Sequence, residues 1–446
     1  MTLCMYLRKI EISDIRALKR VAWALPKDHK GPGWHVILGD NGSGKSSLLQ
    51  AIALALVGPD EAPALRQDFR RWLRTGSERA EITISIEPSE LDEWAGKGRT
   101  KDRVELSVYL GKDESSGDDQ VRARVTAPTD DSRLRRGLWS SQAGWFSAGF
   151  GPFRRFQGGG SESARLFYAS PNLAPHLSLF DEGVALTEGL AWLRKLHNLA
   201  RDAKQRSVTV PEESVLAYLK EFVNQSELLP NGVTLESLDS EDVYFLDGAG
   251  RRVSVMELSD GFRTTLSLTF ELFRLLSWTF GGQTFLQHCQ SAKRDECGPH
   301  VTLPGVVLID EVDAHLHPTW QHRIGAWCKR CFPNIQFIVT THSPIICQAA
   351  EGGTVFKLPQ PGTDEEARML EGLELQRLVY GSVLDAFRTS AFDGQVTQSD
   401  SARALLKELA TLNVKEIAEG LSEDERARQE ELRTILPGRD PQRAGS

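Results

Sequence analysis

Short stretches of the chain alternate apolar and polar side chains, a pattern that predicts half-buried β-strands. The alternation runs through residues 7–24, 80–86, 103–110 and 121–126. We expect residues 7–24 to form two antiparallel strands at the edge of the main sheet, and residues 103–126 to form a hairpin. A second β segment is predicted over residues 233–255, where Asp247 and Gly248 favour a tight turn.

Other stretches have the patterns of buried strands and of helices. The continuous apolar run 306–309 needs burial on both faces, as the centre of a parallel sheet supplies, and the runs 34–38 and 335–341 are also of strand type. Helices are expected within residues 48–56, 177–203, 212–223, 401–412, 414–421 and 422–436. Ser422 and Glu425 have the spacing of a capping box at the start of the last helix. The pattern as a whole predicts an α/β fold.

A glycine-rich turn lies between the run 34–38 and the expected helix at 48–56. Its sequence, Gly-Asp-Asn-Gly-Ser-Gly-Lys-Ser, fits G-x-x-x-x-G-K-[ST] from Gly39 to Ser46. In such a loop, glycines let backbone N–H groups curl around an anion at the positive end of a helix. We expect Lys45 to reach the outer phosphates of ATP, and Ser46 to bind Mg²⁺. The nucleotide-binding candidates are Gly39, Asn41, Gly42, Ser43, Gly44, Lys45, Ser46 and Ser47.

Acidic and imidazole side chains follow two of the apolar strands. Asp310 and Glu311 come directly after the run 306–309, and His342 follows residues 335–341. Because ligands of parallel sheets bind beyond the carboxyl ends of the strands, we expect these side chains beside the phosphate loop. Asp310 is the candidate to hold Mg²⁺ through its water shell, and Glu311 to orient and polarise the attacking water. His342 is a candidate to hydrogen-bond the γ-phosphate or that water.

Composition narrows the class of protein. The chain has 446 residues, enough for two or three folded units, and 40% hydrophobic and 26% charged residues are typical of globular proteins. With a formal net charge of −8, any contact with DNA or RNA must come from local basic patches. No apolar run approaches the roughly 18 residues that span a bilayer, and residues 1–9 lack the order of a signal peptide, so we expect a cytoplasmic protein without membrane contact. Six irregularly spaced cysteines favour a reducing compartment.

Three further features carry weaker signals. The arginine-rich stretch 66–79 fits either a solvated helix face or a contact with a polyanion. The stretch 146–160 combines aromatic residues, arginines and glycines, so it could sit against a nucleotide, with Gln157 near the metal. A zinc site can be imagined from the cysteines, but a helical C-x-x-C without a matched second pair favours buried thiols. The residues concerned are His288, Cys289, Cys297, His300, Cys328 and Cys331.

Three motifs around the Asp-Glu strand resemble those of the ABC-type ATPases of the SMC, RecF and overcoming-lysogenization-defect branch. Residues 258–261, Leu-Ser-Asp-Gly, are similar to the signature motif of that family, although Asp260 and Phe262 depart from its LSGGQ form. Residues 313–318 resemble the D-loop region, and residues 340–344 resemble the histidine switch. The resemblance covers two blocks, about residues 5–60 and 255–360.

The resemblance implies a mechanism that needs two subunits. In this family two ATPase heads pack head to tail around ATP, and the signature residues of one head complete the phosphate site of the other. Ser259 and Gly261 would then clamp ATP that is held by Lys45 and Ser46 of a partner subunit. A small hydroxyl and a glycine at a helix start can offer the γ-phosphate a donor and exposed N–H groups.

The segment between Lys45 and Ser259 bears on the type of ATPase. These residues are 214 positions apart, which exceeds the short helical insert of transporter-type heads, and no long heptad run of an SMC-type coiled coil lies between them. We expect a P-loop ABC-type ATPase head with a mixed sheet, a globular α+β insert and a C-terminal helical tail. The expected boundaries are 1–60 and 255–390 for the head, 61–254 for the insert and 391–446 for the tail.

Compact heads of this kind resemble the ATPase subunits of anti-phage defence systems such as Septu and PARIS, and those of RecF-like repair. The resemblance implies an ATPase that controls a separately encoded nuclease or toxin, with DNA or a phage protein as a possible trigger. Residues 391–446 lack the Asp-x-Asp set of a Toprim nuclease, which favours an effector in trans. Two alternatives stay open: a DNA-repair ATPase of the RecF or SMC type, and a nucleotide-locked scaffold with negligible turnover.

Overall fold

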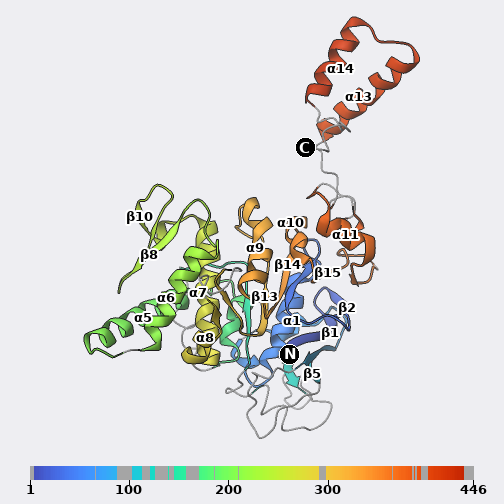
Figure 1. Cartoon of the computed structure of the whole chain (residues 1–446). Helices are drawn as coiled ribbons and strands as arrows, with labels where there is room; N and C mark the ends of the chain where they lie inside the picture. The colour runs from blue at the N-terminus through green and yellow to red at the C-terminus, as the bar shows by residue number, and fades with distance from the viewer. Residues whose placement is uncertain are drawn as a thin grey trace. The chain divides into compact units, whose positions relative to one another are not determined.

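Two compact units make up the chain, Met1–Tyr380 and Gly381–Ser446, and each is described by itself. Figure 1 shows the elements of both units in the computed structural model. The described residues are 5–65, 67–87, 103–112, 121–125, 139, 145–156, 170–184, 186–208, 210–290, 298–363, 365–383, 386, 389–392 and 400–435.

A six-stranded mixed sheet runs through the first unit (Figure 1). In spatial order its strands are β16 (Arg368–Met369), β15 (Thr354–Lys357), β3 (Gly33–Leu38), β14 (Ile335–Thr341), β13 (Gly305–Ile309) and β7 (Ser147–Phe150). Neighbouring strands are parallel except β16, which is antiparallel to β15. Every residue of β13 and β14 is buried, so the prediction of buried parallel strands from the apolar runs is confirmed.

A second sheet is entirely antiparallel. Its strands, in spatial order, are β2 (Leu18–Ala24), β1 (Tyr6–Ile15), β4 (Arg79–Glu87), β5 (Val104–Lys112) and β6 (Val121–Val125). The predicted strands and the pairing of β5 with β6 are confirmed. The prediction that residues 7–24 lie at the edge of the main sheet was wrong, because β1 pairs with β2 on one side and β4 on the other. Alternation gives β1 one buried face but does not specify which sheet it joins.

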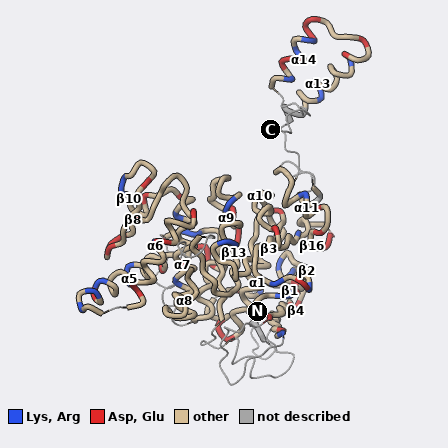
Figure 2. The backbone as a smooth tube through the Cα atoms, in the orientation of Figure 1, with Lys and Arg blue, Asp and Glu red and all other residues tan. Residues whose placement is uncertain are grey.

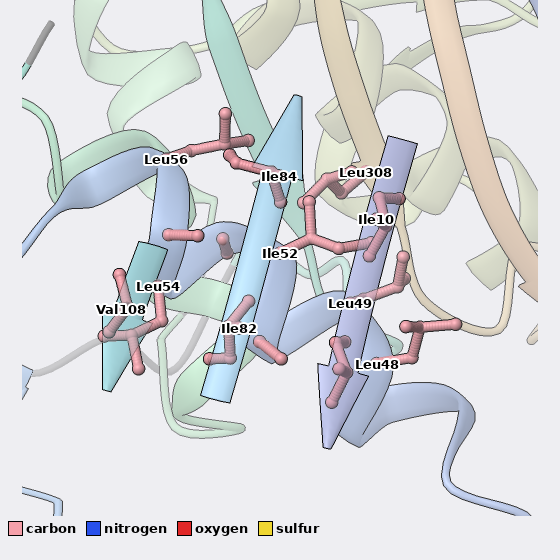
Figure 3. Packing of buried hydrophobic residues seen from close by; sticks show 14 of the residues in the cluster. Ile10, Leu48, Leu49, Ile52, Leu54, Leu56, Ile82, Ile84, Val108 and Leu308 are labelled. Atoms are coloured by element: carbon pink, nitrogen blue, oxygen red, sulfur yellow. The ribbon is translucent and has the colours of Figure 1, made fainter. Parts of the chain in front are cut away.

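Helix α1 (Lys45–Val57) lies between the two sheets. All of its residues except Ser46 and Gln50 are buried, as expected for a helix that is apolar around its whole circumference. In Figure 3, side chains of α1 pack against Ile10, Ile82 and Val108 of the antiparallel sheet, within a cluster that also contains Leu308 of β13. The helix that follows the glycine-rich turn is therefore fixed on both sides by sheet residues.

A mainly helical region occupies the green and yellow part of Figure 1. It contains α5 (Thr187–Gln205), α6 (Pro211–Gln225), α7 (Asp260–Phe280), α8 (Gly282–Gln287) and the antiparallel strands β8 (Thr234–Leu238), β9 (Val243–Leu246) and β10 (Arg252–Ser254). The predicted helices and the hairpin at Asp247 are confirmed. Residues 61–254 contribute β4, β5 and β6 to one sheet and β7 to the other, and the domain boundaries expected from the sequence remain predictions.

Further helices and short strands of the first unit lie outside these groups. They are α4 (Leu177–Phe180), α9 (Pro318–Cys331), α10 (Pro344–Cys347), α11 (Gly372–Tyr380), β11 (Cys289–Gln290), β12 (His300–Val301), and the 3₁₀ helices η1 (Ala62–Leu65), η2 (Phe69–Trp72), η3 (Ala174–His176), η4 (Val255–Glu257) and η5 (Gln348–Ala350). Within the arginine-rich stretch, Arg70 and Arg71 lie in the 3₁₀ helix η2 and Arg79 begins β4, so its described residues do not form the helix face that was one of the two alternatives. Arg70 pairs with Asp68, and a contact with a polyanion stays a prediction. Arg66 lies outside the described residues.

The second unit contains η6 (Ser390–Phe392), α13 (Asp400–Ala418) and α14 (Glu423–Ile435). The separate helices predicted over 401–412 and 414–421 are one continuous helix, because no glycine or proline interrupts α13. The predicted capping box is confirmed, since the Ser422 N–H donates to Glu425 Oε2 at 3.0 Å and the Glu425 N–H donates to Ser422 Oγ at 3.3 Å. Figure 2 shows acidic and basic residues interspersed along α13 and α14. Across the described helices, none has the length and apolar character required to cross a bilayer.

Candidate active site

The glycine-rich loop joins β3 to α1, as its motif predicts. Gly42 and Gly44 have φ angles of 81° and 96°, which belong to the left-handed region that favours glycine. At Gly44 an added Cβ would lie 2.5 Å from Leu18 Cδ2, so a larger residue would collide with β2. No described side chain caps the start of α1, which leaves its first N–H groups available to an anion.

Lys45 folds back over the same loop. Its ammonium donates hydrogen bonds to the carbonyl oxygens of Gly39 at 2.8 Å and Asp40 at 2.9 Å. Burial lowers the pKa of Lys45, while the negative charges of Glu311 and Asp310 act in the opposite direction. The Ser43 hydroxyl is buried and has no hydrogen-bond partner among the described residues. These donors fit a phosphate chain.

The other loop candidates differ in accessibility. Asn41 and Gly42 are exposed, Ser46 is half-buried, and Ser47 is buried. Ser47 Oγ lies 3.5 Å from Arg16 Nη1, and the same guanidinium donates to Gln50 Oε1 at 2.6 Å. Arg16 also lies over the Trp72 ring, 4.5 Å from its centroid. No motif in the sequence marks Arg16, which lies in the turn between β1 and β2.

Asp310 and Glu311 follow β13, at the carboxyl end of the strand. Asp310 is buried and accepts a hydrogen bond from the Thr340 hydroxyl of the adjacent β14. The Thr340 Oγ1 in turn accepts from the Glu311 N–H at 2.7 Å. Glu311 is half-buried and has a φ of 43°, in the left-handed region that a non-glycine residue adopts only at a cost. Thr340 therefore orients both acidic residues, a role that sequence analysis did not anticipate.

His342 follows β14 at the same edge of the sheet. Its Nε2 lies 3.6 Å from Asp313 Oδ2, and 57% of its side chain is exposed. Asp313 is buried and accepts a hydrogen bond from Thr341 Oγ1 at 2.6 Å. The expected grouping of His342 with the acidic segment is thus observed, while its contact with nucleotide stays a prediction.

Arg154 is a second guanidinium that sequence analysis missed. It is 3% exposed and donates to main-chain carbonyl oxygens, including those of Asp310 at 2.9 Å and Glu311 at 3.2 Å. Burial lowers its pKa to about 10, so the group stays protonated at neutral pH. Gln157, the residue of the same stretch that was expected near the metal, lies outside the described residues.

Ser259 and Gly261 lie at the start of α7. Ser259 is exposed and is the N-cap residue, but its side chain makes no capping hydrogen bond. A Cβ added at Gly261 would lie 3.4 Å from the His315 carbonyl oxygen, its nearest non-local neighbour. Within one chain, Gly261 therefore lies against the loop that follows Glu311 and not against the phosphate loop.

The cysteines are largely inaccessible. Cys328, Cys331 and Cys347 are buried, and burial raises the pKa of Cys331 to about 12. Within the described ranges, no three His, Cys, Asp or Glu side chains form a group that could hold a metal ion. Cys297, one member of the imagined zinc cluster, falls outside those ranges.

A phosphate loop that opens onto the carboxyl ends of adjacent parallel strands, with its helix covered by a second sheet, is the arrangement of a P-loop ATPase of the ABC type. The fold class expected from the sequence is therefore confirmed. The chain belongs to the family described as "AAA domain, putative AbiEii toxin, Type IV TA system", whose model matches residues 35–348.

The chain is also similar to individual proteins. The chain is similar to the Septu protein PtuA of Bacillus mycoides (strain KBAB4), with 26% identity over 397 residues, 87% of this chain and 45% of that protein. It is also similar to the retron Ec83 probable ATPase of Escherichia coli, with 39% identity over 106 residues, 24% of this chain and 17% of that protein. The chain spans less than half the length of these two curated relatives. A solved SMC head bound to the C-winged helix domain of ScpA aligns with a TM-score of 0.47 and 18% identity, covering 83% of this chain and 99% of that one.

Proposed function

We propose that the chain binds ATP with Mg²⁺ and hydrolyses it. The observation that carries this proposal is that the phosphate loop follows β3 and the Asp310–Glu311 pair follows β13, two strands that flank β14 in the same parallel sheet. The loop N–H groups and Lys45 would hold the phosphates, and Ser46 and Asp310 would hold Mg²⁺. Bound Mg²⁺ would neutralise charge on the outer phosphates.

The reaction itself would depend on Glu311. Its carboxylate is the base that would orient and polarise the attacking water. His342 would hydrogen-bond the γ-phosphate or that water. Asp313 lies 3.6 Å from the imidazole and supports its orientation.

We further propose that two copies close around ATP, with Ser259 and Gly261 of each copy completing the site of the other. The exposed Ser259 hydroxyl, unused in capping, and the adjacent N–H groups of α7 support this role. Similarity to proteins named Septu protein PtuA and retron Ec83 probable ATPase supports work in anti-phage defence. There the ATPase would control a separately encoded nuclease or toxin, with DNA or a phage protein as the trigger.

The decisive test compares ATP turnover by the wild-type protein and Glu311→Gln in the presence of Mg²⁺. We expect the variant to retain ATP binding and to lose about 10²–10⁴-fold in turnover, since it lacks the general base. Native mass should rise on addition of ATP, most clearly for the variant that does not consume it. If the wild-type protein hydrolyses ATP no faster than a sample without protein, a nucleotide-locked scaffold is favoured instead.

A DNA-repair ATPase is the second alternative, and DNA can test it. Turnover would be measured with and without duplex DNA at two salt concentrations, because phosphate contacts make binding salt-sensitive. A salt-sensitive stimulation would support DNA as a trigger or substrate. An unchanged rate would remove the repair alternative.

A further inference from the structure

Arg154 is a buried cation whose hydrogen bonds all go to main-chain oxygens among the described residues. Its Nη1 donates to the carbonyls of Gly151 and Asp310, both at 2.9 Å. Its Nη2 lies 3.2 Å from the Glu311 carbonyl and 3.3 Å from that of Val312. One guanidinium thus holds together the main chain of the segment that follows β13.

That segment contains the carboxylate on which hydrolysis would depend. The φ of 43° at Glu311 is unfavourable for a residue with a side chain, so the surrounding contacts must maintain it. The Glu311 N–H is held by Thr340 Oγ1, and the Glu311 carbonyl accepts from the Ala314 N–H at 2.9 Å and from Arg154. Arg154 therefore holds the carbonyl side of a strained residue, opposite to Thr340.

Arg154 is itself anchored to α7. The buried Ser267 hydroxyl of α7 donates to the Arg154 carbonyl at 3.1 Å. Nearby, the rings of Phe156 and Phe270 stack with centroids 6.1 Å apart. A pocket of about 590 Å³ lies between residues 153–156, His315 and the first turn of α7. Contacts through Arg154 thus connect α7, which carries the signature-like residues, to the main chain of Glu311.

We propose that Arg154 is a positioning residue that keeps the Glu311 carboxylate directed toward the phosphate loop. The inference rests on the proposed hydrolysis of ATP and deepens it. The guanidinium acts through the main chain, because its hydrogen bonds among the described residues go to carbonyl oxygens. A planar fork is suited to this task, because it can donate to several carbonyls at once, whereas a lysine ammonium is a compact point charge.

The test replaces the planar guanidinium of Arg154 by an ammonium group and so keeps the positive charge. In Arg154→Lys we expect turnover at saturating ATP to fall about 10–100-fold, as loss of charge-assisted hydrogen bonds implies. The KM and the Kd for ATP should change by less than about twofold, because the phosphate loop is unaltered. The matched control is Arg155→Lys, which changes the next residue, an exposed arginine over the Phe153 ring, and should leave turnover unchanged.

A double variant separates positioning from general stabilisation. If Arg154 acts through Glu311, adding Arg154→Lys to Glu311→Gln should lower the residual turnover no further. Independent, multiplicative losses would overturn the inference, as would wild-type turnover in Arg154→Lys. Background turnover in the wild-type protein would overturn the proposed function and this inference with it, so the two failures are distinguishable.

If Arg154→Lys does not fold, Ser267→Ala decides the question. This change removes the hydrogen bond to the Arg154 carbonyl and leaves the guanidinium in place. Turnover should fall about 2–10-fold at unchanged KM, as expected for one buried hydrogen bond. Unchanged turnover in Ser267→Ala would overturn the inference.

Discussion

The two halves of the candidate site are built in different ways. In the phosphate loop, the Lys45 ammonium bonds to carbonyls only five and six positions earlier in the chain. In the acidic half, the carboxylate of Asp310 is held by Thr340, 30 positions away, and the Glu311 carbonyl by Arg154, 157 positions away. The first half is therefore specified by a local sequence, and the second by the tertiary fold.

Because of this difference, we expect substitutions in the two halves to impair different steps, nucleotide binding in one case and turnover in the other. A substitution in the phosphate loop should affect nucleotide binding directly, since the loop makes its own geometry. A substitution among the distant supports of Asp310 and Glu311 should leave binding intact and impair turnover. Measuring binding and turnover together can therefore break or sharpen the comparison.

The largest effect on ATP turnover is expected for Lys45→Ala, a change in the phosphate loop. Loss of the ammonium should reduce ATP turnover on the order of 10²–10³-fold, because a buried positive charge no longer faces the phosphates. Binding of a fluorescent ATP analogue should weaken in parallel. Lys30→Ala, which removes an exposed lysine before β3, is the control and should behave as wild type. Normal ATP binding by Lys45→Ala would contradict the assignment of this half.

A smaller effect on turnover is expected for Thr340→Val, which changes a residue that supports Asp310 and Glu311. Valine has nearly the same shape but leaves the Asp310 carboxylate and the Glu311 N–H without their shared hydroxyl. Turnover should fall about 10–100-fold, while the Kd for ATP stays within about twofold. The control Thr363→Val changes an exposed threonine. A matching loss of ATP affinity would show that the two halves are not separable.

The smallest effect is expected on the stability of the fold, through His35 of β3. This residue links the strand before the phosphate loop to Thr354 of β15. Its imidazole hydrogen-bonds Thr354 Oγ1 and the Gly31 carbonyl, both at 2.9 Å, and burial lowers its pKa to about 3. Because the unfolded state takes up the proton first, stability is complete above pH 6.5 and is lost as the pH falls toward 3. Between pH 7.5 and 5 the loss should be about 2 kcal/mol.

Denaturant unfolding at both pH values would measure this loss. The His35→Gln variant should show a pH dependence smaller than that of wild type by about the same 2 kcal/mol. His176 is also buried, with a pKa lowered to about 3, and His176→Gln serves as the matched comparison outside β3. An unchanged pH dependence in His35→Gln would mean that His35 does not titrate as its burial requires.

The same division explains what could be predicted from the sequence. The phosphate loop, the buried strands β13 and β14 and the start of α7 follow from short patterns that are complete in themselves. The placement of β1 in a second sheet could not be predicted, since alternation marks a buried face without naming the partner strand. Arg154 left no signal either, because its partners are main-chain carbonyls, which every residue possesses.

The position of β3 has a consequence for synthesis of the protein. Its two neighbours in the sheet, β14 and β15, are encoded about 300 residues later. At about 5–20 residues per second, a ribosome needs on the order of tens of seconds to reach them. The strand that leads into the phosphate loop therefore waits for both of its neighbours in the sheet during translation. We expect the loop to bind nucleotide only after β14 and β15 have been synthesised.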